Sequence, residues 1–197
     1  MTAHRRGRGV ALLLAAAVAL GAARAAGEED VPSRERQREE RRAKSHYIYN
    51  FARLATWPRS AFEADTSPFV VGLVGEDPLG EELDAVLHER RVGERDLVLL
   101  RFSDPRDVRP VHLLVFGKLP DGARTNILAA CRHEPVLTLG LEEGLASAGG
   151  VASFFHGEQG RIRFEVNVDA AKRSRIGLSS QLLKLARIIE EGRETPR

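Results

Sequence analysis

The sequence predicts a single α/β domain with a mixed, mostly parallel β-sheet and helices on both faces. Between residues 68 and 140, short apolar runs typical of buried strands alternate with stretches of helical character. After Gly149-Gly150, two apolar runs separated by a glycine-containing turn predict a β-hairpin, which makes the sheet mixed. A C-terminal stretch with leucines at helical spacing then predicts a final helix.

The first residues have the pattern of an export signal. Arg5, Arg6 and Arg8 precede an apolar run at residues 10–20, which is shorter than the roughly 20 residues that span a bilayer. Ala23-Arg24-Ala25 then supplies a small-residue cleavage site, which predicts a mature start at Ala26 by the Sec route. An uncleaved anchor is the alternative. No cysteine follows the run, so we expect no acylated lipoprotein and place the protein in the periplasm.

Removal of the leader changes the charge balance. Residues 1–25 contain four arginines and no acidic residue, which leaves 26 basic and 28 acidic side chains and a formal charge of −2. This balance disfavours nucleic acid as a partner. We expect one domain, because about 170 residues suffice for a full core. The expected boundaries are a signal peptide at 1–25, a charged segment at 26–42, the domain at 43–190 and a tail at 191–197.

A charged helical stretch leads into the domain. From residue 28 to residue 44 acids and bases alternate at helical spacing, which indicates a solvated helix entry, with a basic arm for anionic lipid as the alternative. From Ala43 the pattern is amphipathic, with Tyr47, Phe51 and Leu54 on one stripe. The helix should end near Thr56, because the proline in Trp57-Pro58 disfavours α conformation in the preceding residue.

The elements up to residue 140 follow from apolar runs and turn residues. Residues 68–75 predict a buried strand, and Asp77 with Pro78 predicts the start of a helix that reaches about Arg90. Residues 111–117 are apolar on both faces, as expected of a central strand. Three further elements are expected, namely a strand at 96–102, a helix from about 120 to 133, and a strand at 135–140.

The C-terminal part predicts a hairpin and an interrupted helix. The hairpin strands are residues 151–155 and 161–168, and Asp169 is the predicted cap of the helix that follows. That helix is interrupted at Gly177. Its second part carries one predicted core stripe, formed by Leu178, Leu182, Leu185, Ala186 and Ile189.

Residue patterns for catalysis or metal binding are weak. The histidines His46, His88, His112, His133 and His156 do not have metal-ligand spacing, and His112, in an apolar strand, is interpreted as a hydrogen-bonded core residue. Ser179-Ser180 lacks the setting of a hydrolase nucleophile. The glycines around Glu76-Asp77 fit a tight turn better than a phosphate loop. We therefore expect no enzyme activity, no metal and no cofactor.

The single cysteine, Cys131, excludes an intramolecular disulfide. It is interpreted as a buried apolar residue of its helix, with intermolecular pairing as the alternative.

Seven residues are candidates for binding a partner or ligand. Arg163, Glu165 and Asn167 share one strand face, where they predict either a polar network under the last helix or a pocket for a small ligand. Ser180 and Gln181, together with Ser179, are expected to cap or brace the start of that helix. Phe51 and Trp57 are the aromatic interface candidates, although Phe51 also fits the core.

The ordered set of motifs over about residues 44–190 resembles the YfiR family of periplasmic proteins. The residues that carry the resemblance are Tyr47-Ile48-Tyr49-Asn50-Phe51 with Trp57-Pro58, residues 71–80, 135–140, Glu143-Gly144, Ala148-Gly149-Gly150, Arg163-Phe164-Glu165-Val166-Asn167 and residues 178–187. Redox-controlled members use paired cysteines, and the single Cys131 departs from that pattern.

The resemblance implies a regulatory role. Its best-known member represses an inner-membrane diguanylate cyclase by binding the cyclase's periplasmic part, and an outer-membrane, peptidoglycan-associated lipoprotein releases it. This implies control of cyclic di-GMP and biofilm formation, and we expect a homodimer that does not span the membrane. A periplasmic solute-binding protein is the alternative, but such proteins usually have two lobes and a longer chain.

Overall fold

The structure is a computed structural model that describes residues 31–120 and 122–190. The predicted signal peptide, its cleavage site and the tail at 191–197 lie outside these residues. The chain divides into two compact units at residues 39 and 40, and the second unit contains the sheet. The helices are α2 (Val31–Leu54), α3 (Glu81–Leu87), α4 (Ala123–Cys131), α5 (Val168–Arg173) and α6 (Ser180–Leu185). The strands are β1 (Ala55–Thr56), β2 (Phe69–Val74), β3 (Arg91–Val92), β4 (Arg95–Phe102), β5 (Leu113–Phe116), β6 (Leu137–Gly140), β7 (Ala152–His156), β8 (Ile162–Asn167), β9 (Gly177–Leu178) and β10 (Arg187–Ile189).

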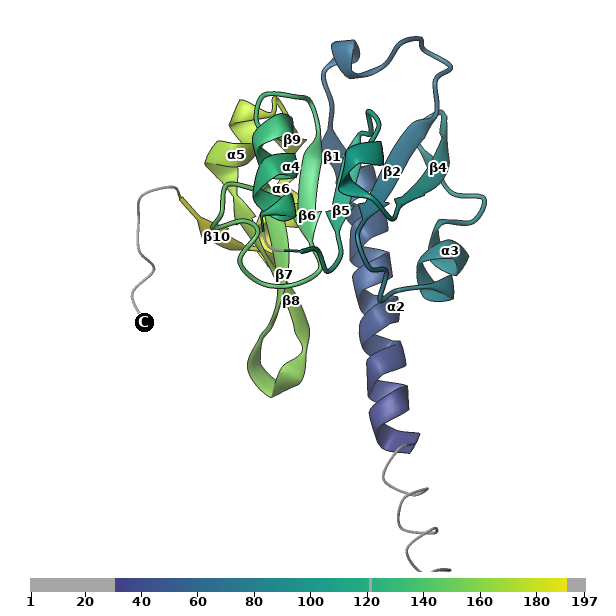
Figure 1. Cartoon of the computed structure of the whole chain (residues 1–197), viewed down its shortest axis with the longest axis vertical. Helices are drawn as coiled ribbons and strands as arrows, with labels where there is room; N and C mark the ends of the chain where they lie inside the picture. Colours follow the sequence, from purple (N-terminus) through teal and green to yellow (C-terminus); the bar gives the residue numbers. More distant parts are fainter. Residues whose placement is uncertain (1–30, 121, 191–197) are drawn as a thin grey trace, which may run out of the picture. The chain divides into compact units, whose positions relative to one another are not determined.

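Eight of the described strands form one sheet in the order β10-β8-β7-β6-β5-β2-β4-β3 (Figure 1). The neighbouring strands β4, β2, β5, β6 and β7, in that spatial order, are all parallel, and β10 is parallel to β8. The β7–β8 hairpin and the β3–β4 hairpin are antiparallel. Every residue of β5 is buried, as predicted for a central strand. The predicted mixed, mostly parallel sheet with a C-terminal hairpin is therefore confirmed.

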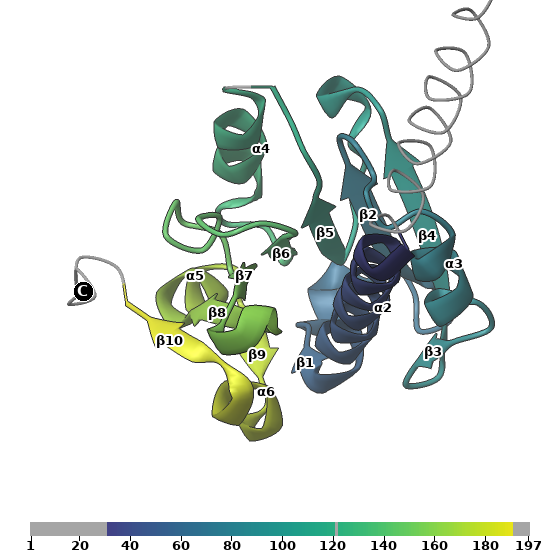
Figure 2. The same cartoon turned by 90° about the horizontal axis from the view of Figure 1, so that it is seen from below.

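The two faces of the sheet carry separate apolar cores. On one face, Ile48 and Phe51 of α2 and Leu83 of α3 pack with Leu73 and Phe164 of the strands. On the other face, Ile127 of α4 packs in a second cluster with Val74, Leu114 and Phe116. Figure 2 shows α2 and α3 on one side of the sheet and α4 on the other. Helices on both faces were predicted, and this arrangement follows from strands that are apolar on both sides.

The end of α2 agrees with the prediction. The helix ends at Leu54, two residues before Thr56, and Trp57-Pro58 continues in a non-helical conformation. Ala55 and Thr56 form the short strand β1, which pairs antiparallel with β9. This pairing joins the end of α2 to the segment between α5 and α6.

The helix that follows β2 is shorter than predicted. It was expected from Asp77 to about Arg90, but α3 begins at Glu81 and ends at Leu87. Asp77 Oδ1 accepts hydrogen bonds from the amides of Leu79 and Gly80, at 2.8 and 3.1 Å, and holds these residues in a turn. Gly80 has a φ of 53°, which ends that turn and is incompatible with helix.

The C-terminal prediction was wrong in two respects. The cap of α5 is Asn167 and not Asp169, because Asn167 Oδ1 accepts from the amide of Ala170 at 2.8 Å. The last helix ends at Leu185, and residues 187–189 form β10 beside β8. Of the predicted core stripe, Leu182 is buried and Leu178 and Ala186 pack partly buried against the core, but Leu185 is 56% exposed.

Candidate functional site

Glu165 is the centre of a polar network on β8 and is only 2% exposed. Its carboxylate accepts from Ser153 Oγ at 2.7 Å and from Arg187 Nη2 and Nε at 2.5 and 3.2 Å. Arg187 Nη2 also lies 2.7 Å from an oxygen of Glu143. The carboxylate is thus removed from water but keeps both hydrogen bonds and a counter-charge, which a buried acid requires.

Asn167, two residues further on β8, joins two other elements. Its Nδ2 donates to the carbonyl of Ala146 at 2.9 Å while its Oδ1 caps α5. Glu165 and Asn167 are thus each hydrogen-bonded to other elements, and no hydrogen bond of the described residues joins them to each other as the predicted network would require. Arg163 is exposed, and its Cγ would meet a Cβ placed on Gly157 at 2.8 Å, so it lies toward the hairpin turn. No hydrogen bond of the described residues joins Arg163 to Glu165.

Sequence reasoning missed three members of this network. Ser153 pairs with Glu165 in the hairpin register, so correct strand pairing alone would have found it. Arg187 was missed because it was placed in a helix, whereas β10 pairs it directly with Glu165. Glu143, on the loop after β6, has no local signal in the sequence.

The start of α6 is capped by Ser179, one of the three residues that were expected to cap or brace it. Ser179 is the N-cap, and its Oγ accepts from the amide of Leu182 at 3.3 Å. Ser180 and Gln181 are exposed in the first turn. They are therefore accessible, but the structure does not bring them into the Glu165 network.

An exposed apolar surface lies beside the network, and we call it the β10 surface. It consists of the β10 edge with Leu185 and Ile188, which are 56% and 44% exposed, and of the partly exposed Phe155. Ile188 follows Arg187 in the strand and therefore lies on the opposite face of the sheet from Arg187 and Phe155. The guanidinium carbon of Arg187 lies 3.8 Å from the centroid of the Phe155 ring. A cavity of about 520 Å³ adjoins this surface, and its lining includes Arg161 and Arg163. The β10 strand stands at the edge of the sheet (yellow in Figure 1).

The two aromatic candidates are less accessible. Phe51 has no exposed surface, and its ring packs edge to face on Phe164 with centroids 5.1 Å apart. Trp57 is partly buried, its Nε1 donates to the carbonyl of His112 at 2.9 Å, and its ring packs on Phe69. Phe51 therefore acts through the core, and only Trp57 retains exposed surface.

His112 is a core histidine, as predicted. Its Nδ1 accepts from the amide of Val70 at 2.9 Å, so Nε2 carries the proton and donates to the carbonyl of Ala61 at 3.1 Å. The ring stacks between Phe62 and Phe69, with centroids 4.4 and 5.0 Å away. Burial lowers the pKa of His112 from its ordinary value of 6.5, and the charge of Arg95 lowers it further.

At the usual ligand position of an open α/β sheet, the backbone turns after β2 and β5 are joined to each other, and a cavity of about 440 Å³ lies beside them. Ligands bind such sheets outside the carboxyl ends of the strands where the strand order reverses, here between β2 and β5. At this point the amide of Glu76 donates to the carbonyl of Lys118 at 3.0 Å. A Cβ on Gly117 would lie 2.0 Å from the carbonyl oxygen of Glu76. The turn interpretation of residues 75–80 is consistent with this closure.

The described residues contain no group of three or more histidine, cysteine or acidic side chains placed to hold a metal ion. Within the same residues, no helix has both the length and the apolar character needed to cross a membrane.

The fold and the site thus define an α/β domain with a mixed sheet, a buried glutamate–arginine network and an apolar strand edge beside it. The chain belongs to the YfiR/HmsC-like family, whose match covers residues 41–187. The matched region runs from α2 to the first residue of β10 and so contains the whole Glu165 network. This confirms the resemblance drawn from the sequence. A comparison with curated proteins found no match.

Proposed function

We propose that this protein is a periplasmic regulator that binds the periplasmic part of an inner-membrane diguanylate cyclase and inhibits it. Membership of the YfiR/HmsC-like family supports this role. The predicted export signal supports the compartment. The observation that carries the proposal is the β10 surface, because two large apolar side chains stay exposed next to a strongly bonded charge network.

The β10 surface has the features of a docking site. In the described sheet β10 pairs only with β8, so its outer edge offers backbone groups to a further strand. Leu185 and Ile188 would be covered by the partner, and the exposed Arg161 and Arg163 would meet acidic groups at the rim. The ion pair between the buried Glu165 and the partly exposed Arg187 would fix the position of β10 before the partner binds.

Inhibition follows from a difference in affinity. The regulator lowers the active fraction of the cyclase only if it binds the inactive state more tightly than the active state. A hundredfold preference corresponds to about 2.7 kcal/mol. An outer-membrane, peptidoglycan-associated lipoprotein that binds the regulator would lower its free concentration and release the cyclase. The protein would act without catalysing a reaction.

Deletion of the gene tests the proposal. Cyclic di-GMP and biofilm should rise in the deletion strain, and the wild-type gene supplied in trans should lower them again. An unchanged level of cyclic di-GMP after deletion, in a strain shown to make the protein, would contradict the proposed function.

Trp57 and the homodimer remain predictions. If Trp57 contributes to partner contact, Trp57→Ala should fold and bind the cyclase's periplasmic part more weakly, and unchanged affinity would exclude the contact. Sedimentation velocity of the mature protein tests the dimer.

A further inference from the structure

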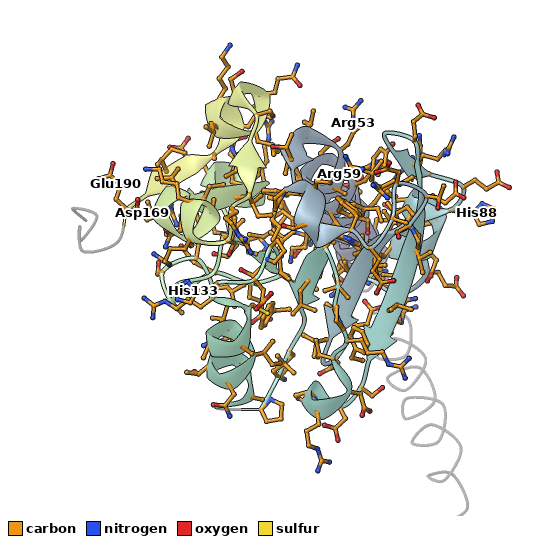
Figure 3. The ribbon with its side chains drawn as sticks, turned by 90° about the horizontal axis from the view of Figure 1, so that it is seen from above. Arg53, Arg59, His88, His133, Asp169 and Glu190 are labelled. Carbon is orange, nitrogen blue, oxygen red and sulfur yellow. The ribbon has the colours of Figure 1, made fainter. Side chains whose placement is uncertain are left out.

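A cavity of about 760 Å³ lies at the amino ends of the central strands, far along the sheet from β10. One wall is residues 60–63 with Ser67 and Pro68, the second is residues 108–112 with Val70 and Leu114, and the third is residues 130–131 and 134–136 with Arg175. Figure 3 labels Arg59, which precedes the first wall, and His133, which lies in the turn after α4. None of the residues of β10 lines this cavity.

The first wall is held in place by the aromatic and polar groups around it. Arg95 Nη1 donates to the carbonyls of Ala64 and Ser67, at 2.9 and 2.6 Å, and its guanidinium lies 3.8 Å from the Phe62 ring centroid. On its other face Phe62 stacks on His112. The wall is therefore built before any ligand arrives, and both faces of Phe62 are covered.

The polar groups of the interior already have partners. Both ring nitrogens of His112 are hydrogen-bonded to backbone, and Ser67 Oγ accepts from the amide of Ala64 at 3.0 Å. Burial, together with the charge of Glu134, raises the pKa of the Cys131 thiol to about 11, so this side chain is neutral. A ligand with a charged or strongly polar group would lose its water here without gaining a hydrogen bond.

The charges at the mouth balance. Arg109 and Arg175 face the solvent on this cavity together with Glu63 and Glu134, so two positive charges are matched by two negative ones. The remaining lining is mainly apolar, and it includes Phe62, Val70, Val111, Leu114 and Val136. Neither sign of ligand charge is favoured, and apolar contact is left as the main attraction.

We infer that this cavity is a binding site for a small, uncharged, apolar molecule. Its volume is in the range of about 300–1,000 Å³ that holds small organic ligands. The inference does not depend on the proposed function, because the β10 surface and this cavity share no residue.

A neutral apolar fluorophore, N-phenyl-1-naphthylamine, tests the site in the mature protein. We expect saturable binding at one site, which Ala130→Trp weakens at least tenfold by filling the cavity. Ala129→Trp is the matched control, because Ala129 is the preceding exposed alanine of α4 and lines a different cavity. It should change the dissociation constant less than twofold. Equal binding by Ala130→Trp and the wild type would overturn the inference, as would tighter binding of the anionic 8-anilinonaphthalene-1-sulfonate.

Cys131 gives a second measurement that needs no variant. It is the one cysteine of the chain and it lines the cavity. A saturating concentration of the neutral fluorophore should slow its alkylation by a maleimide at least fivefold. An unchanged alkylation rate at saturation would place the bound molecule elsewhere and contradict the site.

Discussion

The region around Glu165 and the region around His112 each bury one titratable side chain, but they do so in opposite ways. Glu165 keeps its charge partner, Arg187, and takes a further hydrogen bond from the hydroxyl of Ser153. His112 is neutral, bonds only to backbone, and lies between two aromatic rings. The first arrangement supports a strand edge that exposes apolar residues, and the second supports the wall of an apolar cavity. A buried side chain is therefore kept charged by an ion pair in the first region and kept neutral by backbone hydrogen bonds in the second.

This difference predicts that protein stability depends more on the ion-pair partner of Glu165 than on the groups around His112. Arg187→Ala leaves the Glu165 carboxylate buried without its counter-charge and should lower the free energy of unfolding by about 2–3 kcal/mol. Urea denaturation measures this change. The double variant Glu165→Gln with Arg187→Met should recover part of the loss, because it removes the charge with the partner. A double variant as unstable as the sum of the two single variants would contradict the coupling.

The His112 region should respond instead to pH. Its pKa is lowered in the folded protein, so the stability that neutral His112 contributes is present above 6.5 and is lost as the pH falls below that value. One proton taken up on unfolding limits the slope to about 1.4 kcal/mol per pH unit. Urea denaturation between pH 7.5 and 5.0 should show this slope in the wild type relative to His112→Gln. Parallel curves for the two proteins would show that His112 does not titrate in this way.

Trp57 should have a smaller effect on stability. Trp57→Phe keeps an aromatic ring against Phe69 but removes the hydrogen bond to the carbonyl of His112. That carbonyl also accepts from the amide of Leu137 at 2.9 Å, so it does not become unsatisfied. We expect a loss of about 0.5–1 kcal/mol by urea denaturation. A loss above about 2 kcal/mol in the free energy of unfolding would mean that the indole makes packing contacts that a Phe ring cannot replace.

The β10 surface should contribute least to stability. Ile188 is 44% exposed, so Ile188→Lys should change the free energy of unfolding by less than about 0.5 kcal/mol. Val98→Lys on β4 is the matched control, since Val98 is 38% exposed and lies near the opposite edge of the sheet. Thermal unfolding of both variants measures this effect. A large loss from Ile188→Lys alone would indicate that Ile188 is a core residue.

Local sequence patterns predicted much of this fold, and the exceptions have physical causes. The apolar run of β5, the hairpin and the bonded His112 all follow from burial and periodicity within a few residues. The prediction of a helix through Ile189 was wrong. Leucines at helical spacing continue only to Leu185, and the following residues form β10, in which Arg187 pairs with the buried Glu165.

The candidate site was predicted only in part for the same reason. Glu165 and Asn167 lie on one face of a single strand, which alternation alone identifies. Ser153 and Arg187, which bond to Glu165, and Glu143, which bonds to Arg187, come from other elements, so the pairing of those elements has to be known before they can be found. The exposed Leu185 and Ile188 were assigned to a helical stretch, and their exposure follows only from the short α6 and the edge position of β10.

The most direct test of the account is the cyclic di-GMP level of a deletion strain complemented with Ile188→Lys or with Val98→Lys at equal periplasmic amounts. If the β10 surface binds the cyclase, Val98→Lys should restore the low wild-type level and Ile188→Lys should leave it raised. Full restoration by a folded Ile188→Lys protein would contradict docking through β10.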